Sequence, residues 1–216
     1  MRNQIIQSIE DNKLIAIVRG VKKEQLIPLA EALYAGGIRL LEITYSADGR
    51  VSDEDTAACI EMLANHFAGR MFIGAGTVLT EAQVELTKRA GGCFIISPDT
   101  NAEVIQKTRA LEMVSIPGAL TPTEIRQAQL AGADFVKLFP VTSLGASYVK
   151  AVRAPLSNVR LLAVGGIDEN NMEEYLAAGA CGFGISSGMV NMKLLDACNY
   201  EGITALAKKY TAVLEK

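Results

Sequence analysis

Short apolar segments alternate with longer amphipathic segments along the whole chain, and this alternation restricts the possible folds more than any other feature. The apolar segments are rich in β-branched residues and several end at glycine or proline, as strands do. They occupy residues 14–18, 38–44, 71–73, 93–97, 113–116, 134–140, 159–164 and 182–185. Because they are apolar throughout, they are typical of parallel strands covered by helices. We therefore predict an α/β protein built on a parallel sheet.

The segments between these strands carry apolar residues at helical spacing. Helices are expected at residues 23–35, 53–67, 80–90, 101–110, 123–131, 147–154, 169–178 and 204–214, with a short additional helix at residues 2–12. A glycine pair or a Gly-Ala pair precedes every second strand and indicates a repeated helix-to-strand turn. These pairs are Gly36-Gly37, Gly91-Gly92, Gly132-Ala133 and Gly179-Ala180.

Eight strands alternating with eight helices predict a compact (β/α)8 TIM barrel with a short N-terminal helix, forming one domain over residues 1–216. A doubly wound open sheet is the alternative architecture. That fold is expected to carry a glycine-rich dinucleotide fingerprint after the first strand, where this chain has Arg19-Gly20-Val21. The barrel is therefore favoured.

The composition is that of an ordinary globular protein, with 50% hydrophobic residues, 21% charged residues and a formal net charge of -3. The chain has neither a basic run nor an RNA-binding aromatic motif, so no nucleic-acid partner is expected. No apolar run approaches the ~20 residues of a membrane span, and the N-terminal segment lacks the apolar region of a signal peptide. We therefore expect a cytoplasmic protein that does not bind membranes.

The histidine and cysteine content does not predict a metal site. The only histidine is His66, at the end of a predicted helix, where we expect a surface residue. The four cysteines are far apart and follow neither metal nor disulfide spacing. They are Cys59, Cys93, Cys181 and Cys198. Reduced thiols, no bound metal and no other cofactor are therefore the expectation.

One charged residue stands in the middle of an apolar strand. Lys137 lies in the segment of residues 134–140, and the two-residue period of a strand places Phe135, Lys137 and Phe139 on one face. Poor solvation between two aromatic rings lowers the pKa of an amine, and a neutral amine can form a Schiff base with a carbonyl substrate. The alternative is a lysine whose stem passes along the strand to solvent.

The active site of a TIM barrel is assembled at the C-terminal ends of its strands. The residues expected there are Arg19, Glu42, Thr44, Thr77, Ser97, Pro117, Lys137, Gly165, Gly166, Gly184, Ser186 and Ser187. This set contains a lysine that can form an imine, a carboxylate that can move protons and an arginine that can hold a carboxylate. The glycines and serines after the last two strands offer donors where barrels commonly bind phosphate.

Each of these residues also has a structural interpretation. Glu42 lies within an apolar strand, where it is either a general acid/base with a raised pKa or one partner of a salt bridge across the barrel. Arg19 either binds substrate or pairs with an acid at the rim. Gly165-Gly166 either contacts phosphate or forms a tight turn before a helix.

Taken together, the motifs resemble those of the bacterial KDPG/KHG aldolases, which act on 2-keto-3-deoxy-6-phosphogluconate (KDPG) or 4-hydroxy-2-oxoglutarate (KHG). The resemblance runs nearly end to end. It rests on Arg19-Gly20, Leu41-Glu42-Ile43-Thr44, Gly74-Ala75-Gly76-Thr77-Val78, Ser97-Pro98, residues 117–124, Lys137-Leu138-Phe139-Pro140, Gly165-Gly166-Ile167 and Ser186-Ser187. It implies Lys137 as the Schiff-base lysine and Glu42 as the general acid/base.

The resemblance also implies a set of substrate-binding residues and an activity. The implied binding residues are Arg19, Thr77, Pro98, Gly165, Gly166, Ser186 and Ser187. The implied enzyme is a metal-independent class I aldolase that cleaves KDPG to pyruvate and glyceraldehyde 3-phosphate, with cleavage of KHG to pyruvate and glyoxylate as a second implied reaction. A homotrimer is implied as well. The rival interpretations are a phosphosugar epimerase-type barrel and a non-catalytic sugar-phosphate binder.

Two positions depart from the family pattern. Many members have an arginine four residues after the glutamate, where this chain has Ser46, and many have a threonine before Gly-Gly, where this chain has Val164. The first departure moves carboxylate binding onto Arg19. The second is similar to the members that act on the 6-phosphogalactonate epimer, which is the alternative main substrate.

Overall fold

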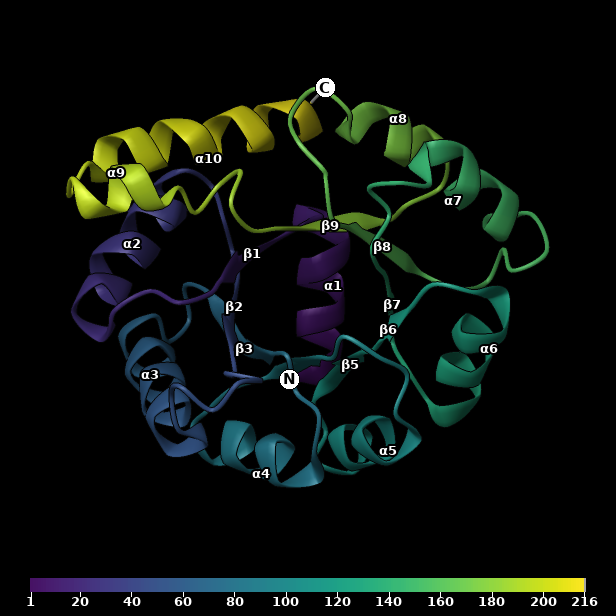
Figure 1. Cartoon of the computed structure of the whole chain (residues 1–216), viewed down its shortest axis with the longest axis horizontal. Coiled ribbons are helices and arrows are strands. Elements are labelled where there is room, and N and C mark those ends of the chain that lie inside the picture. The colour runs from purple at the N-terminus through teal and green to yellow at the C-terminus, as the bar shows by residue number, and fades with distance from the viewer. Residues whose placement is uncertain (216) are drawn as a thin grey trace.

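A computed structural model describes residues 1–215 and has the α/β barrel architecture that the sequence predicts (Figure 1). The strands form one parallel sheet in the order β5-β4-β3-β2-β1-β9-β8-β7-β6. They are β1 (Leu14–Val18), β2 (Leu40–Thr44), β3 (Phe72–Gly76), β4 (Phe94–Ile96), β5 (Val114–Ile116), β6 (Gly118–Ala119), β7 (Val136–Leu138), β8 (Leu161–Val164) and β9 (Gly182–Ile185).

Helices α2 to α10 surround this sheet, and α1 lies across the centre of the ring, as Figure 1 shows. They are α1 (Arg2–Asn12), α2 (Lys23–Ala35), α3 (Asp53–His66), α4 (Glu81–Arg89), α5 (Ala102–Ala110), α6 (Pro122–Ala131), α7 (Gly145–Arg153), α8 (Met172–Ala177), α9 (Met192–Asp196) and α10 (Tyr200–Leu214). Within residues 1–215, none combines the length and the hydropathy needed to cross a bilayer.

The structure has nine strands where the sequence predicts eight, because an additional short strand, β6, follows the predicted fifth strand. Pro117 separates β5 from β6, and proline has no N–H to continue a ladder. The two strands pair with different neighbours, β5 with β4 and β6 with β7. Pro117 also joins the two ends of the strand order, and its carbonyl accepts from the Lys137 N–H at 2.8 Å, so the sheet nearly closes.

The C-terminal helices also differ from the prediction. The chain forms α9 within a segment where no helix was expected, and α10 begins at Tyr200 instead of residue 204. Asparagine side chains start both helices, because Asn191 accepts a hydrogen bond from the Leu194 N–H and Asn199 accepts one from the Gly202 N–H. An N-cap asparagine indicates where a helix begins, and the spacing of apolar residues alone does not show this.

The repeated glycine turns have a common geometry. Gly37, Gly91, Gly132 and Gly179 all have φ between 80° and 104°, in the left-handed region that glycine adopts without steric cost. After each of them the chain donates a hydrogen bond back to the last helical turn, as the Ile38 N–H does to the Leu33 carbonyl at 3.0 Å. These turns direct each of the four helices into the next strand.

The N-terminal end of the barrel is closed by α1, which crosses the centre of the ring in Figure 1. Ile5 and Ile9 of this helix are each 1% exposed and belong to the same apolar cluster as Leu40, Phe94 and Phe135 inside the barrel. This packing fills the lower part of the interior. The side chains toward the C-terminal ends of the strands therefore face the open end.

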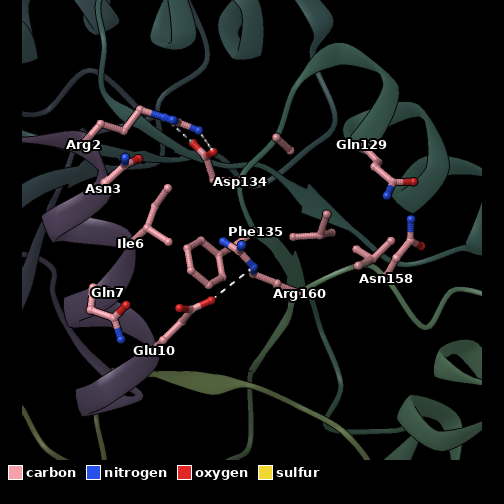
Figure 2. A pocket seen from close by; sticks show the side chains of 13 residues that line it. Arg2, Asn3, Ile6, Gln7, Glu10, Gln129, Asp134, Phe135, Asn158 and Arg160 are labelled. Atoms are coloured by element: carbon pink, nitrogen blue, oxygen red, sulfur yellow. Dashed lines mark hydrogen bonds and ion pairs between the residues drawn. The ribbon is translucent and has the colours of Figure 1, made fainter.

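Ion pairs fasten α1 to the barrel around a cavity of about 570 Å³, shown in Figure 2. Arg2 of α1 pairs with Asp134, which also accepts from Arg109 Nη1 at 2.7 Å and from the Ser115 N–H at 3.0 Å. Glu10 of α1 pairs with the Arg160 guanidinium at 3.2 Å. Since Asp134 comes just before β7, this network ties the N-terminal helix to the strand that carries Lys137.

Candidate active site

The C-terminal ends of the strands surround a cavity of about 520 Å³. Seven of the nine predicted site residues line it, namely Arg19, Glu42, Lys137, Gly165, Gly166, Ser186 and Ser187. Thr77 lies beside it through a hydrogen bond with Arg19. Pro98 does not line it. The Pro98 carbonyl faces Gly118 instead, and an added Cβ at Gly118 would lie only 2.3 Å from that carbonyl oxygen. The barrel therefore gathers the lysine, the carboxylate, the arginine and the glycine and serine turns around one space.

Lys137 lies in the middle of β7 and points into the barrel. Its side chain is nearly buried, with 8% of the residue exposed, and its Nζ lies 4.6 Å from the centre of the Phe139 ring. Burial lowers the pKa of Lys137, and the positive charge of Arg19 adds to this, while the carboxylate of Glu42 opposes it. The net direction favours the neutral amine, which is the nucleophilic form.

Glu42 lies in β2 and lines the same cavity. It is 1% exposed, and within residues 1–215 its Oε2 atom has no hydrogen-bond partner. Burial raises the pKa of Glu42, while the positive charges of Lys137 and Arg19 oppose this shift. A buried carboxyl group with an unpaired oxygen and a raised pKa can accept a proton from a bound molecule and return it.

Gly76 leaves the space that the Glu42 side chain occupies. An added Cβ at Gly76 would lie 1.5 Å from Glu42 Oε1, so any other residue here would displace the carboxylate. The adjacent inward position on the same strand is Gly74, where an added Cβ would lie 2.3 Å from the Phe94 ring. The sequence pattern indicated these two glycines only as part of the motif at residues 74–78, and it did not predict their contacts inside the barrel.

Arg19 and Thr77 lie at the rim of the cavity. Arg19 follows β1 and is exposed, and its Nη2 donates to Thr77 Oγ1 at 3.2 Å. Thr77 has φ of 56°, a left-handed conformation that is costly for a β-branched residue and often marks a functional position. This pair presents a guanidinium and a hydroxyl next to the lysine, an arrangement that can hold a carboxylate.

One end of the cavity is formed by the turns after β8 and β9. Gly165 and Gly166 have φ of 100° and 69°, and added Cβ atoms at these positions would press against Thr142 at 3.2 and 2.8 Å. The left-handed φ values and the close approach of Thr142 both disfavour a side chain at these two positions. Asp168 and Tyr210 also line this end, and sequence analysis missed both. Tyr210 could not be found from a local pattern, because α10 brings it to the site from the far end of the chain.

The KDPG and KHG aldolase family model matches residues 5–206 of the chain. The chain belongs to this family. Among its relatives, a probable 2-dehydro-3-deoxy-6-phosphogalactonate aldolase from Rhizobium meliloti is 38% identical over 83% of this chain and 82% of its own. A 2-dehydro-3-deoxy-phosphogluconate aldolase from Treponema pallidum is 34% identical over 95% of each chain.

Solved structures of aldolases share the fold. The KDPG aldolase from Legionella pneumophila, with pyruvate captured as a covalent carbinolamine intermediate, has a TM-score of 0.84 and 30% identity, covering 94% of this chain and 96% of its own. Members of the KDPG and KHG aldolase family are carbon–carbon lyases that release pyruvate, and this chain is an aldolase of that kind. Independence from metal fits the Schiff-base mechanism of class I aldolases.

Proposed function

We propose that this aldolase cleaves KDPG to pyruvate and glyceraldehyde 3-phosphate through a Schiff base on Lys137. One observation carries the proposal: a buried lysine with a lowered pKa and a buried carboxylate with a raised pKa line the same cavity. Opposite shifts of this kind are typical of a nucleophile and an acid/base that act together. We also propose a cytoplasmic homotrimer, which the family resemblance implies. The mass of the particle in solution should then be three times that of one chain.

The reaction begins at the keto group. The neutral amine of Lys137 attacks the keto carbon, and loss of water with uptake of one proton from solvent gives a protonated imine; the final hydrolysis to the free amine releases that proton. Arg19, supported by Thr77, holds the adjacent carboxylate of the substrate through charge-assisted hydrogen bonds. The Phe139 ring stabilises the cationic imine through a cation–π contact, because the Lys137 nitrogen lies over its face.

Glu42 moves the proton that cleavage requires. Its carboxylate takes the C4 hydroxyl proton, directly or through a water, as the C3–C4 bond breaks and the aldehyde leaves. The electron pair of that bond passes into the imine and gives an enamine. Glu42 then returns the proton to C3, and water hydrolyses the resulting pyruvyl imine to pyruvate and the free amine. The proton taken in cleavage is thus the one returned, and Glu42 ends as it began.

The turns at Gly165-Gly166 and Ser186-Ser187 are proposed to bind the phosphate of the substrate. They offer backbone and hydroxyl donors at the end of the cavity that the turns after β8 and β9 form. Each charge-assisted hydrogen bond contributes about 1.5–3 kcal/mol, so two of them favour a phosphorylated six-carbon acid over KHG by at least about a hundredfold in kcat/KM.

The 6-phosphogalactonate epimer is the second candidate substrate. The Rhizobium meliloti relative, at 38% identity, is named for that substrate, and Val164 places a methyl group where a threonine hydroxyl could contact a sugar hydroxyl. Kinetics with KDPG, its galactonate epimer and KHG test the choice. Val164→Thr should shift the ratio of kcat/KM between the two epimers, and an unchanged ratio would remove Val164 from the argument. Equal cleavage of KHG would reject the phosphate assignment.

Reductive trapping tests the Schiff base itself. Incubation with pyruvate and borohydride should add one reduced pyruvyl group, which peptide mass spectrometry should locate at Lys137. Lys150, an exposed lysine on α7, is the internal control and should remain unmodified. An epimerase-type barrel or a sugar-phosphate binder would give no adduct, and an adduct at Lys150 would contradict the proposed nucleophile.

A further inference from the structure

The turn after β9 has two N–H groups that find no backbone acceptor in the part of the chain that the structure describes. The Ser186 carbonyl accepts from the Met189 and Val190 N–H groups at 2.9 and 2.8 Å, and these two bonds fold the turn. Within residues 1–215, the Ser187 and Gly188 N–H groups donate no backbone hydrogen bond. Both residues are exposed and line the cavity. The turn is therefore a donor surface whose orientation depends on what supports it from below.

Tyr210 provides that support. Its side chain is 1% exposed and reaches from α10 to the underside of the turn, where its hydroxyl lies 2.3 Å from the position of an added Cβ at Gly188. The next ring carbon, Cζ, lies at 3.4 Å from the same position, which is ordinary van der Waals contact. Gly188 does not have a left-handed φ, so its backbone conformation is open to alanine. The hydroxyl of Tyr210 alone accounts for a glycine at this position.

The surroundings of Tyr210 hold it in place. On α10, the hydroxyls of Thr204 and Thr211 donate to the Ala32 and Gly36 carbonyls of α2 at 2.9 and 3.1 Å, which fixes the helix on the barrel. Burial raises the pKa of Tyr210 to about 12, as do the nearby carboxylates of Glu169 and Asp168 and a hydrogen bond with Glu169, so the hydroxyl stays protonated and uncharged. A phenolate here would repel an anion, whereas the neutral hydroxyl does not.

We propose that Tyr210 is a positioning residue for the distal anion: its hydroxyl holds the turn of residues 186–188 so that the Ser187 and Gly188 N–H groups face the substrate phosphate. This inference rests on the proposed function, because it assigns the phosphate to that end of the cavity. Tyr210 meets the turn after β9, whereas the reacting carbonyl is bound by Lys137 of β7. It should therefore affect the binding of phosphorylated substrates and leave Schiff-base formation with pyruvate unchanged.

A rescue experiment tests the contact. Gly188→Ala should raise KM for the phosphorylated substrate about tenfold, the loss of one charge-assisted hydrogen bond, with KM for KHG and the rate of pyruvate trapping unchanged. Adding Tyr210→Phe should restore much of the lost affinity, because the new methyl group then meets only Cζ. Tyr210→Phe alone should raise the same KM by a smaller factor.

Two results would overturn the inference. One is a double variant no better than Gly188→Ala, and the other is an equal effect on KHG or on pyruvate trapping. Thermal melting of each variant separates these outcomes from loss of folding. If the wild-type enzyme itself shows no preference for phosphorylated substrates, the phosphate assignment fails. If that preference is present and rescue is absent, only the role of Tyr210 fails.

Discussion

Replacing Glu42 with glutamine should separate proton transfer from imine formation. Glutamine keeps the shape of the side chain in the space that Gly76 leaves, but it cannot take or return a proton. General acid/base groups contribute about a hundred- to ten-thousandfold, which corresponds to about 2.7–5.5 kcal/mol of transition-state stabilisation. We expect kcat for KDPG to fall within that range. The reduced pyruvyl adduct at Lys137 should still form, more slowly.

The same substitution should change the pH dependence of trapping. The carboxylate of Glu42 opposes the lowering of the Lys137 pKa by burial. Its removal should therefore lower the pKa of Lys137 further, and the rise of the trapping rate with pH should occur at a lower pH in the variant. Single-turnover trapping across a pH series, with the adduct counted by mass spectrometry, measures this shift.

Stability should respond to pH in a defined direction. The pKa of Glu42 is raised in the folded protein above its ordinary value of 4.5. Its contribution to stability is therefore fully present below that value and is lost as the pH rises through the folded pKa. Glutamine does not titrate, so the free energy of unfolding of the wild type should fall relative to that of the variant as the pH is raised. The further lowering of the Lys137 pKa in the variant acts in the same direction.

Glu61→Gln, on the exposed face of α3, is the matched control and should leave turnover, trapping and the pH dependence of unfolding unchanged. An unchanged kcat in Glu42→Gln would assign Glu42 to a structural salt bridge. Complete loss of trapping would instead mean that Glu42 is needed to form the imine. A constant difference in unfolding free energy across the pH series would refute the direction of the Glu42 pKa.

Two further substitutions test the frame of the barrel. Asp134→Asn should lower the free energy of unfolding in urea by about 2–3 kcal/mol, because it breaks a nearly buried network whose guanidinium groups reach solvent. The control is Asp48→Asn, in an exposed ion pair, which should leave the urea midpoint unchanged. Equal effects of the two substitutions would contradict this reasoning. Glu112→Gly should raise thermal stability by about 0.5–1 kcal/mol, because Glu112 has φ of 56° in the left-handed region. Glu112→Ala should give no such gain.

The parts of the site that depend on strand periodicity could be predicted from the sequence. A charged residue within an apolar strand is conspicuous, and the two-residue period places Lys137 and Glu42 toward the interior of any barrel built from these strands. The order of strands and helices then places the ends of β1, β2, β7, β8 and β9 at one face. Composition and local pattern were sufficient to predict these residues, because each lies in or directly after a strand whose position determines which way the side chain faces.

The residues that sequence analysis missed depend on contacts between distant elements. Tyr210 meets Gly188 only because α10 packs back on α2, and no local signal distinguishes it from another apolar residue of an amphipathic helix. The additional strand β6, after Pro117, likewise depends on the closure of the sheet. Before closure, a proline at the end of a strand looks like an ordinary stop signal, whereas in the barrel β5 and β6 pair with different neighbours.

The position of Glu42 shows how packing supports the proposed chemistry. A carboxyl group at 1% exposure with an unpaired oxygen is costly to keep, and a larger residue at Gly76 would force it out of the interior. The parallel register pairs Glu42 with Gly74 and Thr44 with Gly76, so both glycines lie beside the carboxyl-bearing strand. The third strand thus gives up side-chain packing to leave room for an acid whose pKa is raised by burial. The loss of an apolar contact at this position is the expected cost of keeping a proton-transfer group in the same cavity as Lys137.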